Sequence, residues 1–196
     1  MGGFIVTTVA IWKDKSGNGY DAVGSGDLPT LVENGINNMP AIYFETNSQQ
    51  LQMPTIDMKN YTCFIVLKTE EPTTNRGYFV NDVLYVGFRG DGTEYSFSRE
   101  PGASHLPFKR DKFQPDVPQV YCISRTGYGG TITFRINKEN IDTSGTQVRY
   151  WTGGSTNWIG HNETYISEIL VYNRELTLEE KNQIEDYLID KYELVV

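Results

Sequence analysis

The sequence predicts an all-β fold, an antiparallel sandwich or jelly roll, with one C-terminal α-helix. Three observations lead to this prediction. Short apolar stretches with a polar residue at every second position recur along the 196 residues, and turn residues separate them. Glycine occurs 19 times and aromatic residues make up 13%, which favours strands and turns over helices. Helical periodicity is found in one segment near the C-terminus. The length fits a single domain, residues 1–196.

The strands are expected at short intervals along the chain. Residues 131–137 carry apolar side chains at every second position, so Arg135, on the other face, is expected to contact solvent. The segments 88–97 and 124–134 predict β-hairpins, because glycine-rich turns join their two halves. The predicted strands are 4–12, 41–45, 61–68, 77–81, 83–88, 93–98, 117–125, 131–137, 146–151, 156–160 and 164–172.

The helix is expected at residues 178–191. Thr177 has the side chain of an N-cap, and Glu180 three residues later completes a capping box. Five residues recur at helical spacing and so share one face of the helix, which is expected to pack on the sandwich. They are Leu178, Lys181, Ile184, Leu188 and Tyr192. The carboxylates of this segment are expected on its solvated face; they are Glu179, Glu180, Glu185 and Asp186.

Two cysteines, Cys63 and Cys122, lie inside apolar strand-like stretches. Buried free thiols are the first interpretation, because a free cysteine behaves as a small apolar residue. A disulfide requires that the two strands are neighbours in the sheet, which the sequence does not decide.

The composition excludes some partners. A net charge of −8 and a pI near 4.8 argue against nucleic acid and anionic membrane surfaces, which bind basic proteins. No apolar run approaches the about 20 residues that a membrane span needs, so membrane insertion is not predicted. An acidic, tyrosine-rich surface suits neutral polar ligands and metal cations better.

The motifs of the common enzyme classes are missing from the sequence. His105 and His161 are far apart, and neither lies beside a plausible nucleophile. No strand carries the pair of inward carboxylates that a β-sandwich glycosidase uses as acid and as base or nucleophile. We therefore predict that the protein is not an enzyme. The tripeptide Arg89-Gly90-Asp91, which integrins bind, falls at a predicted hairpin tip, where a tight turn alone explains its Gly-Asp-Gly stretch.

A candidate metal site lies in the stretch "DKSGNGYD". Asp14, Ser16 and Asn18 place oxygens at alternate positions before a glycine, as in the first half of an EF-hand loop, and Asp21 or Asp27 could add a carboxylate. No bidentate glutamate follows at the twelfth position. The stretch therefore predicts either a structural Ca²⁺ site or a turn in which Asp14 and Asn18 bond their own backbone.

A candidate carbohydrate site lies in "YWTGGSTNWIGHNETY". A sugar is bound by an exposed aromatic ring that stacks on its face and by polar groups that meet its hydroxyls. Aromatic residues at alternate positions of a strand can also be core residues. The candidate residues are Tyr150, Trp151, Asn157, Trp158, His161 and Asn162.

Four stretches together resemble the LamG-like members of the concanavalin A-like lectin/glucanase superfamily. In chain order they are "WKDKSGNGYDA", "PTLVENGINNMPAIYFE", "YTCFIVLK" and "ISEILVYNRELTLEEKNQIEDYLIDKYEL". The resemblance implies a two-sheet antiparallel jelly-roll sandwich with one C-terminal α-helix, which binds glycans or protein partners and often holds a structural Ca²⁺. Such modules are parts of bacterial secreted enzymes and adhesins and of phage virion proteins. The catalytic branch of the superfamily has a carboxylate cluster that this sequence lacks.

We therefore predict a non-catalytic carbohydrate-binding or adhesion module, whose partner is a glycan or a cell-surface polysaccharide. The alternative is a structural or decoration protein of a virion, which uses the fold for assembly with other virion proteins and has no sugar ligand. The expected location is extracellular or on a virion surface. The first residues lack the basic region and the cleavage site of a signal peptide.

Overall fold

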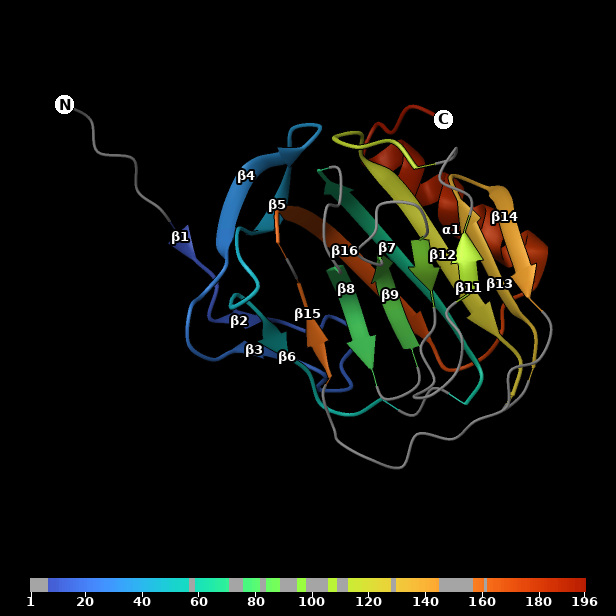
Figure 1. Cartoon of the computed structure of the whole chain (residues 1–196), viewed down its shortest axis with the longest axis horizontal. Coiled ribbons are helices and arrows are strands. Elements are labelled where there is room, and N and C mark those ends of the chain that lie inside the picture. The colour runs from blue at the N-terminus through green and yellow to red at the C-terminus, as the bar shows by residue number, and fades with distance from the viewer. Residues whose placement is uncertain are drawn as a thin grey trace.

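Two antiparallel β-sheets pack face to face in the computed structural model of this protein (Figure 1). The structure describes residues 7–56, 59–70, 76–81, 84–88, 95–97, 106–108, 113–127, 130–144, 157–160 and 162–196. Sheet A has the order β1 (Thr7–Thr8), β4 (Thr30–Ile36), β5 (Met39–Phe44), β16 (Thr164–Tyr172), β7 (Tyr61–Thr69), β12 (Gln119–Arg125), β13 (Ile132–Ile136) and β14 (Glu139–Ser144). Sheet B has the order β11 (Leu106–Phe108), β10 (Tyr95–Phe97), β9 (Leu84–Phe88), β8 (Arg76–Asn81), β15 (Trp158–Ile159), β6 (Leu51–Gln52), β3 (Ala22–Gly24) and β2 (Ile11–Trp12). The predicted antiparallel sandwich is confirmed.

Most predicted strands are present, with some differences. The two predicted hairpins are confirmed, since β9 pairs with β10 and β12 with β13. A single strand over 4–12 is wrong: its described part forms β1 in sheet A and β2 in sheet B, because the chain crosses between the sheets. The sequence did not predict β3, β4, β6, β11 or β14. In β4, a register shift between Val32 and Ile36 interrupts the alternation that a strand prediction needs. The predicted strand 146–151 lies outside the described residues.

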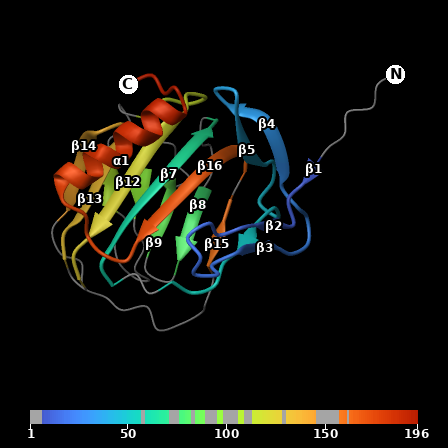
Figure 2. The same ribbon diagram turned by 180° about the vertical axis from the view of Figure 1, so that it is seen from behind.

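The main core lies between the sheets, and a second apolar layer lies between sheet A and the helix α1 (Leu178–Lys191). Figure 2 shows α1 lying across the outer face of sheet A. The central strand β7 contributes to both layers, because Ile65 faces sheet B while Phe64 and Val66 lie on the side of α1. This double burial explains why β7 is apolar without interruption from Cys63 to Leu67.

The helix begins and ends where the sequence predicts, and Thr177 and Glu180 form the expected capping box. Three expectations about its surroundings are wrong. Leu178 is 60% exposed, whereas Glu185 and Arg135 are buried. Glu185 and Arg135 are buried because α1 packs on the outer face of β12 and β13, where the two side chains pair. Glu179 and Asp186 are exposed, as expected. Within the described residues, no helix is long and apolar enough to cross a membrane.

Cys63 and Cys122 are free and buried, as first expected. Their strands are indeed neighbours, but Cys63 aligns with Ile123, and Cys122 aligns with Phe64. A shift of one residue places the two side chains on opposite faces of sheet A, so they cannot form a disulfide. Burial raises the pKa of both thiols.

Candidate functional site

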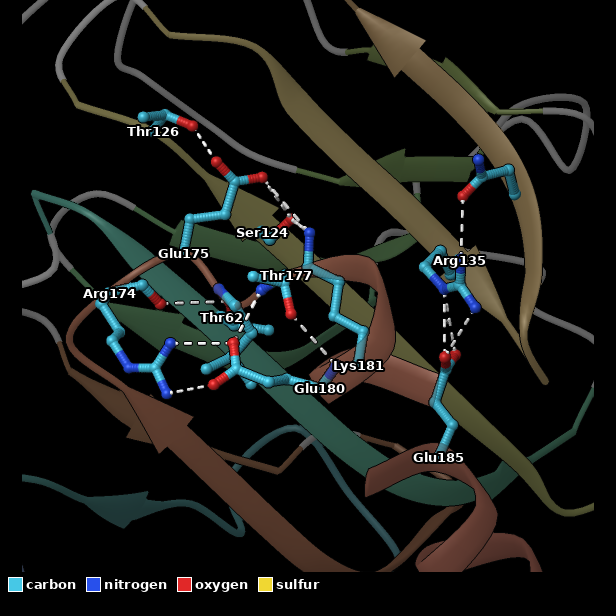
Figure 3. A network of polar contacts seen from close by, with 12 residues as sticks. Thr62, Ser124, Thr126, Arg135, Arg174, Glu175, Thr177, Glu180, Lys181 and Glu185 are labelled. Carbon is cyan, nitrogen blue, oxygen red and sulfur yellow. Dashed lines mark hydrogen bonds and ion pairs between the residues drawn. The ribbon is translucent and has the colours of Figure 1, made fainter. Parts of the chain in front are cut away.

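A polar network fastens α1 to sheet A (Figure 3). On one side of it, the guanidinium of Arg135 donates to the Glu185 carboxylate, with Nη2 and Nε at 2.8 and 3.0 Å from Oε2. The two side chains are 4% and 0% exposed. Arg135 also donates to the side-chain oxygens of Asn140 and Asn182, at 3.4 and 2.7 Å. Glu185 Oε1 in turn accepts from Lys138 N at 3.1 Å. Both ions of this buried pair are therefore hydrogen-bonded as well as paired, which such a pair needs to be stable.

A second group of contacts holds the start of α1. The Lys181 ammonium donates to Ser124 Oγ at 2.6 Å and to Glu175 Oε1 at 3.2 Å. Thr62 Oγ1 accepts from Leu176 N and donates to the carbonyl of Arg174, so one hydroxyl fastens the chain just before the helix. These contacts fix where α1 begins.

An open groove of about 470 Å³ lies beside this network. Both cations that line it are paired with carboxylates of the protein, Arg135 with Glu185 and Lys181 with Glu175. The groove therefore offers little uncompensated charge to a ligand, and the network serves to hold the helix. Its lining residues are Thr133, Arg135, Asn140, Glu175, Leu176, Thr177, Leu178 and Lys181.

A different part of sheet A carries an aromatic surface. Five aligned residues cross the strands β1, β4, β5, β16 and β7, and directly aligned residues point to the same face. Ile42 and Phe44, the two neighbours of Tyr43 in β5, point into the core between the sheets. The aligned residues therefore lie on the outer face of sheet A. Figure 2 shows that α1 lies toward β12, β13 and β14 and away from β4 and β5. The hairpin end of β4 and β5, at Ile36 and Ala41, packs in the layer with α1 and the residues after it. We call this set the tyrosine row: Thr8, Thr30, Tyr43, Tyr165 and Lys68.

The two tyrosines of the row are stacked. Their ring centroids are 4.4 Å apart, with an angle of 25° between the planes. The Lys68 ammonium lies 4.2 Å from the centroid of Tyr165, on which it makes a cation–π contact. Tyr165 is thus in contact with Tyr43 from one strand and with Lys68 from the other. On the far side of Tyr43 the aligned residue is the small Thr30, so that face of the ring is the more open one.

Carboxylates act on the two tyrosines of the row. Burial contributes most to raising the pKa of Tyr43, and Tyr165 and nearby carboxylates raise it further. Burial and nearby carboxylates also raise the pKa of Tyr165. Both phenols are therefore protonated at neutral pH and can donate a hydrogen bond. The acidic residues acting on one or both tyrosines are Glu45, Glu70, Asp116 and Glu163.

The predicted metal loop forms a hydrogen-bonded turn. Asp14 Oδ1 accepts from Ser16 N at 2.8 Å, and its Oδ2 accepts from Ser16 Oγ at 2.8 Å and Tyr20 N at 3.1 Å. Asp21 Oδ1 accepts from Asp14 N at 2.9 Å, while Lys13 pairs with the other oxygen. The hydrogen bonds that the Asp14 carboxylate accepts lower its pKa. The pKa of Asp21 is also lowered, mainly by the hydrogen bond from Lys13.

The turn brings together all four candidate ligands, since Asn18 donates to Ser16 Oγ from its backbone and from its side chain. The Asp14 carboxylate accepts from local backbone N–H groups, as the turn interpretation expects. The side chain of Asn18 was expected to bond its own backbone, but it donates to Ser16 Oγ. Among the described residues, no three His, Cys, Asp or Glu side chains gather as a metal cluster would. Calcium binding here stays a prediction.

The predicted carbohydrate residues are only partly described. Tyr150, Trp151 and His161 lie outside the described residues, as does the Arg-Gly-Asp tripeptide of residues 89–91. Asn157 is buried, and its side-chain nitrogen donates to Thr55 Oγ1 at 2.9 Å.

The remaining two residues of that cluster are half-buried. Trp158 lies on the outer face of sheet B, because its neighbour Ile159 belongs to the core and adjacent strand residues point to opposite faces. Asn162 lies in the turn before β16, where its carbonyl accepts from Thr164 Oγ1. This cluster stays a prediction, and its Trp158 lies on the other sheet from the tyrosine row.

No protein-family model and no curated protein sequence matches this chain. Solved structures do. Trypanosoma rangeli sialidase in complex with sialic acid superposes with a TM-score of 0.66 and 13% identity over 91% of this chain and 31% of that chain. The binding domain of Paraclostridial Mosquitocidal Protein 1 gives 0.70 and 11%, over 91% of this chain and 50% of that chain. The receptor binding domain of botulinum neurotoxin C/D mosaic serotype gives 0.70 and 12%, over 90% and 48%.

The chain has a β-sandwich fold in common with these proteins. It spans between 31% and 50% of the length of the three neighbours. At 11 to 13% identity the likeness concerns the fold alone. The function must therefore be argued from this chain's own side chains.

Proposed function

We propose that this protein is a non-catalytic carbohydrate-binding module of the LamG-like type, and that it binds sugar on the outer face of sheet A. The observation that carries the proposal is the stacked pair of Tyr43 and Tyr165 on the outer face of sheet A, at the edge of the layer that α1 covers. An aromatic ring at a surface offers an apolar face for the C–H face of a sugar and a hydroxyl at its rim. The more open face of Tyr43 takes this role.

The other residues of the tyrosine row supply hydrogen-bonding groups. Thr8 and Thr30 place two hydroxyls on the side of Tyr43 away from Tyr165, and a hydroxyl both donates and accepts. The surrounding carboxylates accept bonds from sugar hydroxyls, and the protonated phenols donate to them. An aromatic face with polar groups at its edge is the arrangement that sugar recognition requires.

Two parts of the proposal rest on the sequence. A Ca²⁺ ion bound by Asp14, Ser16, Asn18 and Asp21 would hold the first turn shut, and the module would act outside a cell or on a virion surface. Both fit a binding module whose ligand is a cell-surface polysaccharide. Assembly with other virion proteins is the alternative that a failed sugar test would favour.

A glycan array, probed with and without EDTA, tests the proposal. We expect binding that Tyr43→Ala weakens about tenfold, the effect of losing about 1.4 kcal/mol of stacking. Tyr187→Ala is the matched control, because Tyr187 is a 52%-exposed tyrosine on α1, outside the row, and its loss should leave binding unchanged. The absence of any bound glycan under both conditions would refute the proposal.

The same assay separates the two candidate surfaces. Trp158→Ala should leave binding unchanged if the tyrosine row is the site. Binding that is lost in Trp158→Ala and kept in Tyr43→Ala would move the site to the outer face of sheet B. Loss of binding in EDTA, together with the same loss in Asp14→Asn, would show that a cation supports the site.

A further inference from the structure

Two tyrosines lie in direct contact on the outer face of sheet A. Tyr43 of β5 and Tyr165 of β16 are aligned across the two strands, and their ring centroids are 4.4 Å apart. Both side chains are half-buried, so both remain partly accessible to solvent. Two phenols held this close have a chemistry that a single tyrosine lacks, because one-electron oxidation can join their rings covalently.

The geometry of the pair is fixed by its neighbours. Aligned residues of two antiparallel strands have Cβ atoms about 4.5–5.5 Å apart, which sets the spacing of the rings. The Lys68 ammonium lies 4.2 Å from the centroid of Tyr165, so this ring has Lys68 on one side and Tyr43 on the other. The angle of 25° between the tyrosine planes keeps the Cε carbons of one ring facing the other ring. The reacting atoms are therefore close together before any oxidant arrives.

The coupling of two tyrosines balances in atoms and electrons. Each phenol loses one electron to the oxidant and its hydroxyl proton to water, which leaves a phenoxyl radical with spin on the Cε carbons. A Cε–Cε bond forms between the rings, the hydrogen on each bonded carbon leaves as a proton, and each oxygen takes up a proton. With hydrogen peroxide as the oxidant and a peroxidase that removes single electrons, two tyrosines and one peroxide give one dityrosine and two waters.

We propose that Tyr43 and Tyr165 form an oxidation site, at which a one-electron oxidant joins their rings as dityrosine and ties β5 to β16. The crosslink falls where few residues join the strands, since β16 aligns with β5 over three residue pairs and with β7 over eight. The strands β1 and β4 are attached to the sheet through β5. The new bond therefore fastens one end of sheet A. The inference does not depend on sugar binding.

The test exposes the folded protein, at low concentration, to a peroxidase and hydrogen peroxide. We expect a monomer whose mass has fallen by two hydrogen atoms, with the fluorescence of dityrosine and a linked pair of peptides that contain Tyr43 and Tyr165. The yield per chain should not change on dilution, because the reaction occurs within one molecule. The same treatment in denaturing urea should give at least about tenfold less of this product, since unfolding removes the fixed contact.

Tyr43→Phe and Tyr165→Phe keep an aromatic ring in each place and remove the phenol, so each should abolish the linked peptides. Tyr187→Phe is the matched control, because Tyr187 is an exposed tyrosine on α1, and its loss should leave the product unchanged. The crosslinked protein should melt roughly 5–15 °C above the unreacted one, because the bond closes a loop of more than about 100 residues and restricts the unfolded chain.

Absence of the linked peptides would overturn the inference, as would an equal yield from the folded and the unfolded protein. Crosslinks found only between molecules would overturn it as well. An unchanged melting temperature of the crosslinked monomer would refute the stabilising role of the bond.

Discussion

Removing the Glu185 carboxylate should destabilise this protein more than most single substitutions. In Glu185→Ala the guanidinium of Arg135 would remain 4% exposed, with only the amide oxygens of Asn140 and Asn182 as described partners. Breaking a buried ion pair by removing one partner costs about 3–5 kcal/mol, because the other charge stays buried without compensation. For a chain of this length, this loss lowers the melting temperature by roughly 6–20 °C.

Urea unfolding, followed by circular dichroism, measures the loss as a change in the free energy of unfolding. The double variant Arg135→Met/Glu185→Leu separates the cost of an unpaired charge from the loss of packing. We expect it to be within about 1 kcal/mol of the wild type or more stable, because apolar residues often replace a buried ion pair without loss.

The matched control is the pair of Lys138 and Asp186, which lies beside the buried pair and is 37% and 56% exposed. Asp186→Ala should cost about 0.5 kcal/mol or less, since water screens exposed pairs. A loss below about 1 kcal/mol in Glu185→Ala, or an equal loss in both variants, would refute the reasoning that burial makes this pair important.

Four further outcomes can be measured. Thr177→Ala removes the N-cap hydroxyl of α1 and should cost about 1 kcal/mol in the urea experiment. Gly160→Ala should cost more, on the order of 3 kcal/mol, because Gly160 has φ +101° and a Cβ atom there would collide with a buried aromatic ring. Cys63 and Cys122 should not react with a thiol reagent in the folded protein, and both should react in denaturant; reductant should not change the stability. Glu180, which accepts from an arginine and from the N-cap backbone, has its pKa lowered to about 2. Its contribution is complete above the unfolded pKa of about 4.3 and disappears as the pH falls toward 2, so the stability difference between wild type and Glu180→Gln should shrink over that window.

Local chemistry in the sequence was enough to predict the main elements. The alternation of apolar and polar residues gave the strand 164–172 and much of the other long strands, because a strand places successive side chains on opposite faces. The capping box of Thr177 and Glu180 gave the start of the helix, because its hydrogen bonds join residues three positions apart. Short strands such as β6 escaped prediction because two residues show no period.

The environment of each face depended on contacts between distant segments. Arg135 alternates with apolar residues, as a solvated residue would, yet α1 covers it and Glu185 pairs with it. Tyr43 and Tyr165 belong to strands far apart in the sequence, and only the antiparallel register of β5 and β16 stacks their rings. The sequence by itself determined where strands and the helix form, since those signals act over a few residues. The tertiary structure decided which faces are buried, charged or open to a ligand, because the order of strands in a sheet sets which side chains meet.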